Sequence, residues 1–190
     1  MLEIVRRRCP GLVPPDPLPA GALAPAVTVA PKATQELLTA AALHVTGLSG
    51  GSGTAVVWAR NDCELLVEVA AVRIRLARGV VALTVPVRCD EVGAADVHAS
   101  FAIGDADRPA GLFAATESHP RGPRLVIDVW GEALVAFAWH LLLLVAAHVA
   151  FAAGEDVDGA GLVPAGLAAG PDGLTVLPQA RHTFDRVSHP

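Results

Sequence analysis

Tyrosine is absent from this chain of 190 residues, and lysine occurs only once, at Lys32. Reactions that use a tyrosine acid, a Tyr–Lys pair or a Schiff-base lysine are therefore largely excluded. Charged residues make up only 17% of the chain and the formal net charge is −5. This balance argues against nucleic acid as a ligand, because a nucleic-acid site needs a basic surface. Arginine supplies nearly all of the positive charge beside abundant Ala, Gly and Val, a usage typical of a GC-rich bacterial genome.

Cysteine is also scarce. Cys9, Cys63 and Cys89 cannot all pair with one another, and their spacing matches no zinc module. Acidic neighbours follow two of them, so we expect unreactive, reduced thiols in a cytoplasmic protein. Prolines interrupt residues 10–19 so often that no signal-peptide core of about 7–15 apolar residues fits there. Residues 1–32 are instead predicted to form an extended, Pro-rich arm.

Motifs for catalysis or metal binding are missing too. Gly47–Gly51 matches the G-x-S-x-G pattern, but a hydrolase needs Ser49 on a turn from a strand to a helix. Here a helix is predicted before that turn and a strand after it, which is the reverse order. Residues 104–109 and 156–161 place acids two apart as calcium loops do, yet neither segment supplies the later glutamate. We therefore predict neither a metal nor a cofactor.

Hydrophobic residues, by contrast, are in excess at 53% of the chain. That share is high for a soluble monomer, so we expect a second copy, a partner, a ligand or lipid to cover part of the apolar surface. The most apolar stretch is Glu132–Gly154, which is long enough to cross a bilayer. A membrane span is disfavoured, because His140 and His148 lie inside the stretch and its acidic flanks offer no positive anchor. A helix that is apolar on all sides is otherwise buried on all sides.

The periodicities of the chain predict an α+β fold. A helix is expected over residues 33–47, and apolar alternation with a period of two predicts a curved antiparallel meander of about five to six strands over residues 54–130. Arg124–Trp130 is the last expected strand, and the long apolar helix should pack on the sheet. The tail is predicted to be irregular, with one short strand at Leu174–Leu177. The predicted organisation is an extended arm (1–32, with a short edge strand at 26–30), a core domain (33–154) and a Gly/Pro-rich tail (155–190).

A hairpin with its turn at Arg78-Gly79 is the most specific local prediction. That turn brings the apolar faces of its two strands into register. The expected cross-strand pairs are Leu76 with Val81, Ile74 with Leu83 and Val72 with Val85. Before this hairpin, the apolar residues change face at Ala70-Ala71, which predicts a bulge or bend. Pro86 marks an edge or bulge position in the second strand.

Three hypotheses of function follow from the apolar helix. The first is a non-enzymatic assembly or scaffold subunit, a homo-oligomer joined through Glu132–Gly154 that binds another protein with its arm or tail. The second is a carrier of a lipophilic small molecule. The order of helix, meander and long helix resembles helix-grip proteins in topology, without a shared motif. That resemblance implies a lipophilic cavity between the sheet and the helix.

The third hypothesis is an enzyme, with Asp128, Glu132 and His140 as acids or bases whose pKa burial could shift. His140 and His148 are separated by about 80° around a helix, so the helix alone builds no metal site. The ligand or interface candidates are aromatic and apolar side chains of the sheet and the helix, together with the two histidines. They are Trp58, Phe101, Phe113, Trp130, Phe137, Trp139, His140, Leu141, Leu144, His148 and Phe151.

Overall fold

Two helices and two antiparallel sheets make up the described part of the protein. The computed structural model describes residues 25–48, 55–60, 62–112, 116–117, 119–154 and 161–180. The four-stranded sheet has the order β1-β10-β9-β7, and the six-stranded sheet has the order β2-β3-β5-β6-β8, with β4 pairing with β5. The elements are β1 Val27–Val29, α2 Pro31–Val45, β2 Val56–Arg60, β3 Cys63–Val67, η1 Val69–Ala71, β4 Arg73–Ala77, β5 Val80–Cys89, β6 Gly93–Ala102, β7 Ala110–Gly111, β8 Thr116–Glu117, α3 Arg124–Ala152, β9 Val163–Gly170 and β10 Gly173–Gln179. The predicted α+β fold class is confirmed.

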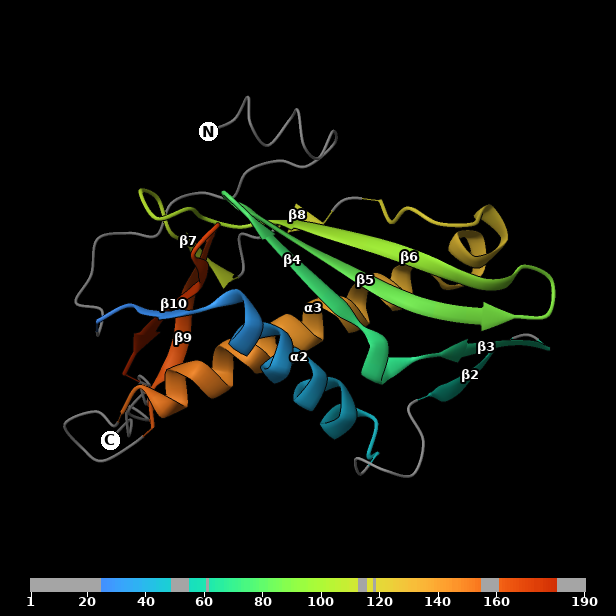
Figure 1. Cartoon of the computed structure of the whole chain (residues 1–190), viewed down its shortest axis with the longest axis horizontal. Helices are drawn as coiled ribbons and strands as arrows, with labels where there is room; N and C mark the ends of the chain where they lie inside the picture. The colour runs from blue at the N-terminus through green and yellow to red at the C-terminus, as the bar shows by residue number, and fades with distance from the viewer. Residues whose placement is uncertain are drawn as a thin grey trace, which may run out of the picture.

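Helix α3 runs along the length of the molecule and passes behind α2 and behind β5 and β6 in the view of Figure 1. It packs on β5 and β6 of the six-stranded sheet and on β9 and β10 of the other sheet, and α2 lies against it. Each of these elements contributes fully buried side chains to one core. Examples are Leu38, Leu83, Phe101, Leu134 and Leu174.

The β4–β5 hairpin has the predicted register. Its paired residues include Ile74 with Leu83 and Leu76 with Val81. The expected pair of Val72 with Val85 does not form, because the pairing ends at Arg73 and the N–H of Val72 bonds to Val69 in the preceding 3₁₀ turn. Gly79 has a φ of 69°, a left-handed conformation that glycine adopts without strain, so the tight turn forms where it was expected. Residues that alternate with the buried ones, such as Thr84, face away from the core.

A short 3₁₀ turn, η1, separates β3 from β4 and confirms the predicted change of face at Ala70-Ala71. Val69 and Val72 are both buried although they are three residues apart, because the turn rotates the chain between them. Pro86 of β5 lies opposite this break, and its carbonyl accepts the N–H of Glu68 (2.9 Å). In an antiparallel strand the N–H and C=O of one residue point to the same side. On that side of β5 neither strand pairs with Pro86, because the pairing with β4 stops before it and the pairing with β3 starts after it. The proline thus occupies the position of β5 where its loss of a donor costs least.

The expected strand Arg124–Trp130 is wrong, because these residues form the first two turns of α3. Its β-branched residues favour a strand, but tertiary packing overrides that preference. Pro123 immediately precedes the helix, and Arg124 pairs with Asp128 at the i, i+4 spacing of a helix (3.4 Å). Gly131 lies inside α3, where a Cβ would press on Ile127 and Pro120.

The irregular tail predicted after residue 154 is also wrong over residues 163–179, which form the β9–β10 hairpin. The strand expected at Leu174–Leu177 is confirmed as part of β10. Strand β9 was missed because Ala and Gly dominate Val163–Gly170, and neither residue favours strands. The expected strand at 26–30 is confirmed as β1, which pairs with β10 at the edge of the four-stranded sheet. The helix-grip resemblance implied that the long helix ends the fold, but this hairpin follows α3 and packs on it.

The two sheets meet at one corner, where the β4–β5 turn contacts the loop after β6 and strand β9. The N–H of Gly79 donates to the carbonyl of Ala169 (3.0 Å), and the N–H of Ala169 donates to the carbonyl of Gly104 (2.8 Å). Gly104 is surrounded by backbone atoms of Arg108, Pro109 and Ala110 that leave no room for a Cβ. Glycine is therefore required there by the close approach of two chain segments.

Asp105 fixes the same corner through its carboxylate, which is only 3% exposed. It accepts the Nε–H of Arg78 (3.1 Å) and the backbone N–H groups of Asp107 (3.1 Å) and Arg108 (3.0 Å). Burial raises the pKa of Asp105, but the hydrogen bond and charge of Arg78, with the two N–H donors, outweigh burial and hold the pKa below its ordinary value. The ionised form of Asp105 therefore stabilises the corner.

We expect Gly104→Ala to destabilise the protein by about 2 kcal/mol or more, because the new Cβ collides with backbone rather than with a side chain that can move. Gly170→Ala is the matched control, since nothing lies within 4 Å of its Cβ position. The control should change the free energy of unfolding, measured in urea, by less than about 0.5 kcal/mol. Equal effects of the two substitutions would refute the close approach at Gly104.

We expect Asp105→Asn to cost about 1–3 kcal/mol at neutral pH, because it removes a buried, hydrogen-bonded charge. A depressed pKa in the folded state means that this stabilisation is present above the unfolded pKa, about 3.9, and is lost as the pH falls through the lower folded value. Urea denaturation between neutral pH and about pH 3 should show a smaller loss of stability in Asp105→Asn than in the wild type. Asp107→Asn, which removes an exposed partner of the same Arg78, should stay within about 1 kcal/mol of the wild type.

Candidate functional site

Much of the α3 surface that the described residues leave uncovered forms one stripe along the helix. At 100° per residue, the stripe is centred on His140. Glu132 and His148 lie at its two margins, each about 80° from the centre. The stripe comprises exposed and half-buried side chains: Leu125, Val129, Ala133, Ala136, His140, Leu143, Leu144, Ala147 and Phe151. We call this set the α3 stripe.

The α3 stripe is apolar at both ends and narrow in the middle. Leu125 is 61% exposed and Phe151 is 70% exposed, the two largest values among the exposed large hydrophobic residues of the described chain. Between them stand Ala133, Ala136 and Ala147, whose short side chains let another helix approach closely. The 29 residues of α3 give a length of about 43 Å. The stripe is thus a long surface without a carboxylate except at its margin.

A groove beside the stripe widens this surface toward α2. It has a volume of about 390 Å³. It is lined mainly by apolar side chains of the two helices, with one histidine from each: Leu37, Ala40, Ala41, His44, Leu144, Val145, Ala147 and His148. The α2 side of this groove was missed by the sequence analysis. The signal was present, because α2 carries apolar residues beyond the narrow face that meets the core.

The candidate residues predicted from the sequence divide into buried, half-buried and exposed groups. Trp130, Phe101, Phe137 and Leu141 are buried; Trp58, Trp139 and Leu144 are half-buried; His140, His148 and Phe151 are exposed. Phe113 lies outside the described residues. The structure brings Leu144, His140, His148 and Phe151 together on or beside the α3 stripe and places the others in the core or at its border.

Aromatic side chains hold the six-stranded sheet on α3. The ring of Trp58 on β2 contacts Trp130 (centroids 6.2 Å apart) and meets Phe137 edge to face (5.6 Å). Phe101 on β6 contacts Trp139 (5.1 Å). Such pairs add about 0.5–1.5 kcal/mol to the area that they bury. These five residues act as core packing between sheet and helix.

Asp128, Glu132 and His140, the predicted acids and bases, are exposed on α3. The burial on which that hypothesis depended is absent. Asp128 is instead paired with Arg124 across one helical turn (3.4 Å). Among the residues that the structure describes, no group of three or more His, Cys, Asp or Glu side chains could hold a metal ion. The described geometry therefore assembles no acid–base pair around these residues.

Within the described ranges, one helix is long and apolar enough to cross a membrane, and it is α3. Of its most apolar 18-residue window, 56% is buried inside the molecule. A core helix passes the same test of length and composition. The apolar character of α3 is therefore accounted for in large part by contacts within the chain.

Comparison with known proteins finds no match: neither protein-family models, nor curated protein sequences, nor solved structures resemble this chain at a significant level. The case for a function therefore depends on the chemistry of the chain itself.

We expect two phenylalanines of α3 to respond in opposite ways to truncation. Phe137→Ala should cost about 3 kcal/mol of folding free energy, because it empties a buried position and removes the edge-to-face contact with Trp58. Phe151→Ala should change the stability of the monomer by less than about 0.5 kcal/mol, since that ring is mostly exposed. Urea unfolding at low protein concentration measures both values, and a large loss in Phe151→Ala would contradict its placement on the free surface.

Proposed function

We propose that this chain is a non-enzymatic assembly subunit that self-associates through the α3 stripe. The observation that carries the proposal is the stripe itself, an apolar surface as long as the helix and bounded by exposed Leu125 and Phe151. Monomeric proteins rarely expose a contiguous apolar surface of this kind. Covering a large apolar side chain contributes about 1.5–3 kcal/mol, so contact through this stripe is favourable.

A second copy of the chain is the occupant that suits the stripe best. In a two-fold contact the same surface meets itself, so a strongly charged patch would repel its own copy. The α3 stripe contains no Asp, Glu, Lys or Arg, and Glu132 lies at its edge. A stable interface buries about 800 Å² on each partner. The α2–α3 groove widens the apolar surface beside the stripe. Alanines at the middle of the stripe allow two α3 helices to pack closely.

The predicted arm and tail play a different part in this proposal from the one first expected. Strand β1 of the arm and strands β9 and β10 of the tail pair within the chain, so their described residues are occupied. Binding of another protein by residues 1–24 or 181–190 stays a prediction. Self-association through α3 does not depend on it.

We expect Ala136→Arg to convert the oligomer to a monomer, because it places a long charged side chain at the middle of the stripe. Ala152→Arg is the matched control: it makes the same substitution at an exposed position of the same helix, about 120° from the centre of the stripe. Light scattering coupled to size exclusion gives the molar mass of each variant. Circular dichroism establishes that both remain folded.

A monodisperse wild-type monomer at about 100 μM would overturn the proposal, as would equal masses of the Ala136→Arg protein and the wild-type oligomer. The same measurement with and without detergent separates a soluble oligomer from a chain that needs lipid. An oligomer that forms only in detergent would favour the membrane alternative and reject the soluble assembly.

The second candidate function is a carrier of a lipophilic small molecule, and the observation that favours it is the α2–α3 groove of about 390 Å³ with its apolar lining. Ligand pockets commonly have volumes of about 300–1,000 Å³. Native mass spectrometry after mild purification should then reveal a bound lipid. A wild-type chain at its bare mass, together with an oligomer that Ala136→Arg dissociates, would leave only the assembly function.

A further inference from the structure

The six-stranded sheet carries a polar groove on its outward face, with a volume of about 660 Å³. Side chains alternate along a strand, and Leu83 and Ala99 are buried in the core that contains α3. Their neighbours Thr84 and Ser100 therefore face the other way, into the groove. The groove and the α3 stripe lie on different sides of the molecule, so an inference about one does not depend on the other.

Strand register aligns the groove residues in two rows across the sheet. Cross-strand neighbours on one face lie about 4.5–5.5 Å apart, so each row forms a continuous polar strip. The first row is Arg73, Thr84, His98 and Arg121, and the second is Arg75, Ala82 and Ser100. Arg121 is held in line by two backbone hydrogen bonds with His98 (2.8 and 3.0 Å).

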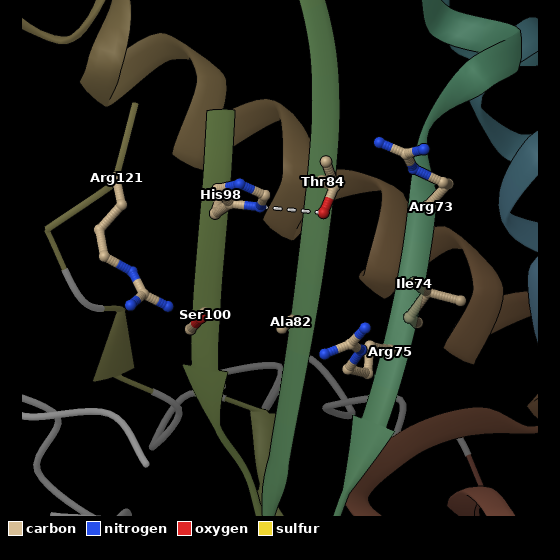
Figure 2. A pocket seen from close by; sticks show the side chains of 8 residues that line it. All are labelled: Arg73, Ile74, Arg75, Ala82, Thr84, His98, Ser100 and Arg121. Carbon is tan, nitrogen blue, oxygen red and sulfur yellow. Dashed lines mark hydrogen bonds between the residues drawn. The ribbon is translucent and has the colours of Figure 1, made fainter. Parts of the chain in front are cut away.

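Short side chains form the floor of the groove and long ones form its sides. Ala82 and Ser100 occupy the centre of the second row, where they leave space above the sheet. Figure 2 shows the guanidinium groups of Arg75 and Arg121 turned toward this floor from opposite sides. Each guanidinium presents a planar set of N–H donors that matches two oxygens of one anion.

Positive charge is concentrated here although the chain as a whole has a net charge of −5. Arg73 is neutralised by Asp96 on the same face (2.7 Å). Among the side chains that the structure describes, no carboxylate lies within salt-bridge distance of Arg75 or Arg121. Two like charges directed at one space repel each other, so an anion placed between them is stabilised by both.

Thr84 and His98 add a neutral donor at the head of the groove. The Thr84 hydroxyl and His98 Nδ1 are 3.0 Å apart and share one hydrogen bond. If the hydroxyl donates, His98 carries its proton on Nε2; if Nδ1 donates, the hydroxyl proton is free. In either arrangement one further N–H or O–H is available to an oxyanion.

We propose that this groove binds the phosphate group of a small soluble molecule. Arg75 and Arg121 hold the phosphate oxygens over Ala82 and Ser100, and the Thr84–His98 pair donates a further hydrogen bond. A phosphate dianion accepts hydrogen bonds at all of its oxygens and matches the donors that converge here from Arg75, Arg121 and the Thr84–His98 pair. The groove is far larger than a phosphate ion and leaves room for the remainder of a phosphorylated compound.

The test is isothermal titration calorimetry of the full chain with inorganic phosphate, at constant ionic strength. Arg75→Gln and Arg121→Gln should each weaken phosphate binding about tenfold or more, because each removes a charge-assisted hydrogen-bonding pair. Arg88→Gln is the matched control: Arg88 lies on the same face of β5, 61% exposed and outside the groove. It should change the affinity less than about twofold, since screened charges at a distance contribute little.

A second variant tests the floor without removing an arginine. Ala82→Glu introduces a carboxylate between Arg75 and Arg121 and should abolish phosphate binding while raising the thermal midpoint of the phosphate-free protein. Absence of saturable phosphate binding would overturn the proposal. So would equal weakening by Arg88→Gln, which indicates general attraction rather than a site. Binding of single-stranded RNA without any response to phosphate would also overturn it, in favour of a nucleic-acid surface.

Discussion

The burial of α3 is the constraint on which the rest of this structure depends. A helix with apolar residues on every side cannot rest on one sheet, because a single sheet covers only one of its faces. Three sets of elements cover α3: β5 and β6 on one side, β9 and β10 on another, and α2 alongside. The corner at Asp105 and Gly104 matters for the same reason, since it fixes the angle at which the two sheets enclose the helix.

What remains after this enclosure defines two surfaces of opposite character. The α3 stripe is apolar and long, with alanines between its larger side chains, which suits contact with another helix. The outward face of the six-stranded sheet is polar and carries converging arginines, which suits a small anion. Because the first lies on the helix and the second on the far side of the sheet, one molecule can be held in an assembly and still present the groove to solvent. This arrangement is compatible with an assembly that binds a small anion. It is equally compatible with a simple scaffold.

Local patterns in the sequence predicted much of the fold. The β4–β5 hairpin, the break at Ala70-Ala71 and helix α2 follow from residue periodicity and turn chemistry, which act over a few residues.

Long-range packing could not be predicted from such local patterns. Residues 124–130 have the composition of a strand and become helix because α3 continues through Gly131, and β9 is too rich in Ala and Gly to be recognised without its partner β10. With the β9–β10 hairpin unrecognised, two of the strands that cover α3 were left out of the predicted fold. His140 and His148, named as candidates from the sequence, lie exposed on α3. Arg121 joins the arginines of β4 only through a backbone bridge to His98, which no sequence pattern signals.

The pairing of β1 with β10 has a consequence for how the chain reaches this structure. Val27 lies opposite Val176, so the two partners are separated by about 150 residues of synthesis. During synthesis β1 leaves the ribosome early, long before its partner β10. The local partners of the six-stranded sheet and of α3 are made before β10. Since synthesis proceeds at about 5–20 residues per second, the C-terminal half of α3 stays open to water, and to chaperones, for several seconds before the final hairpin arrives to close over it.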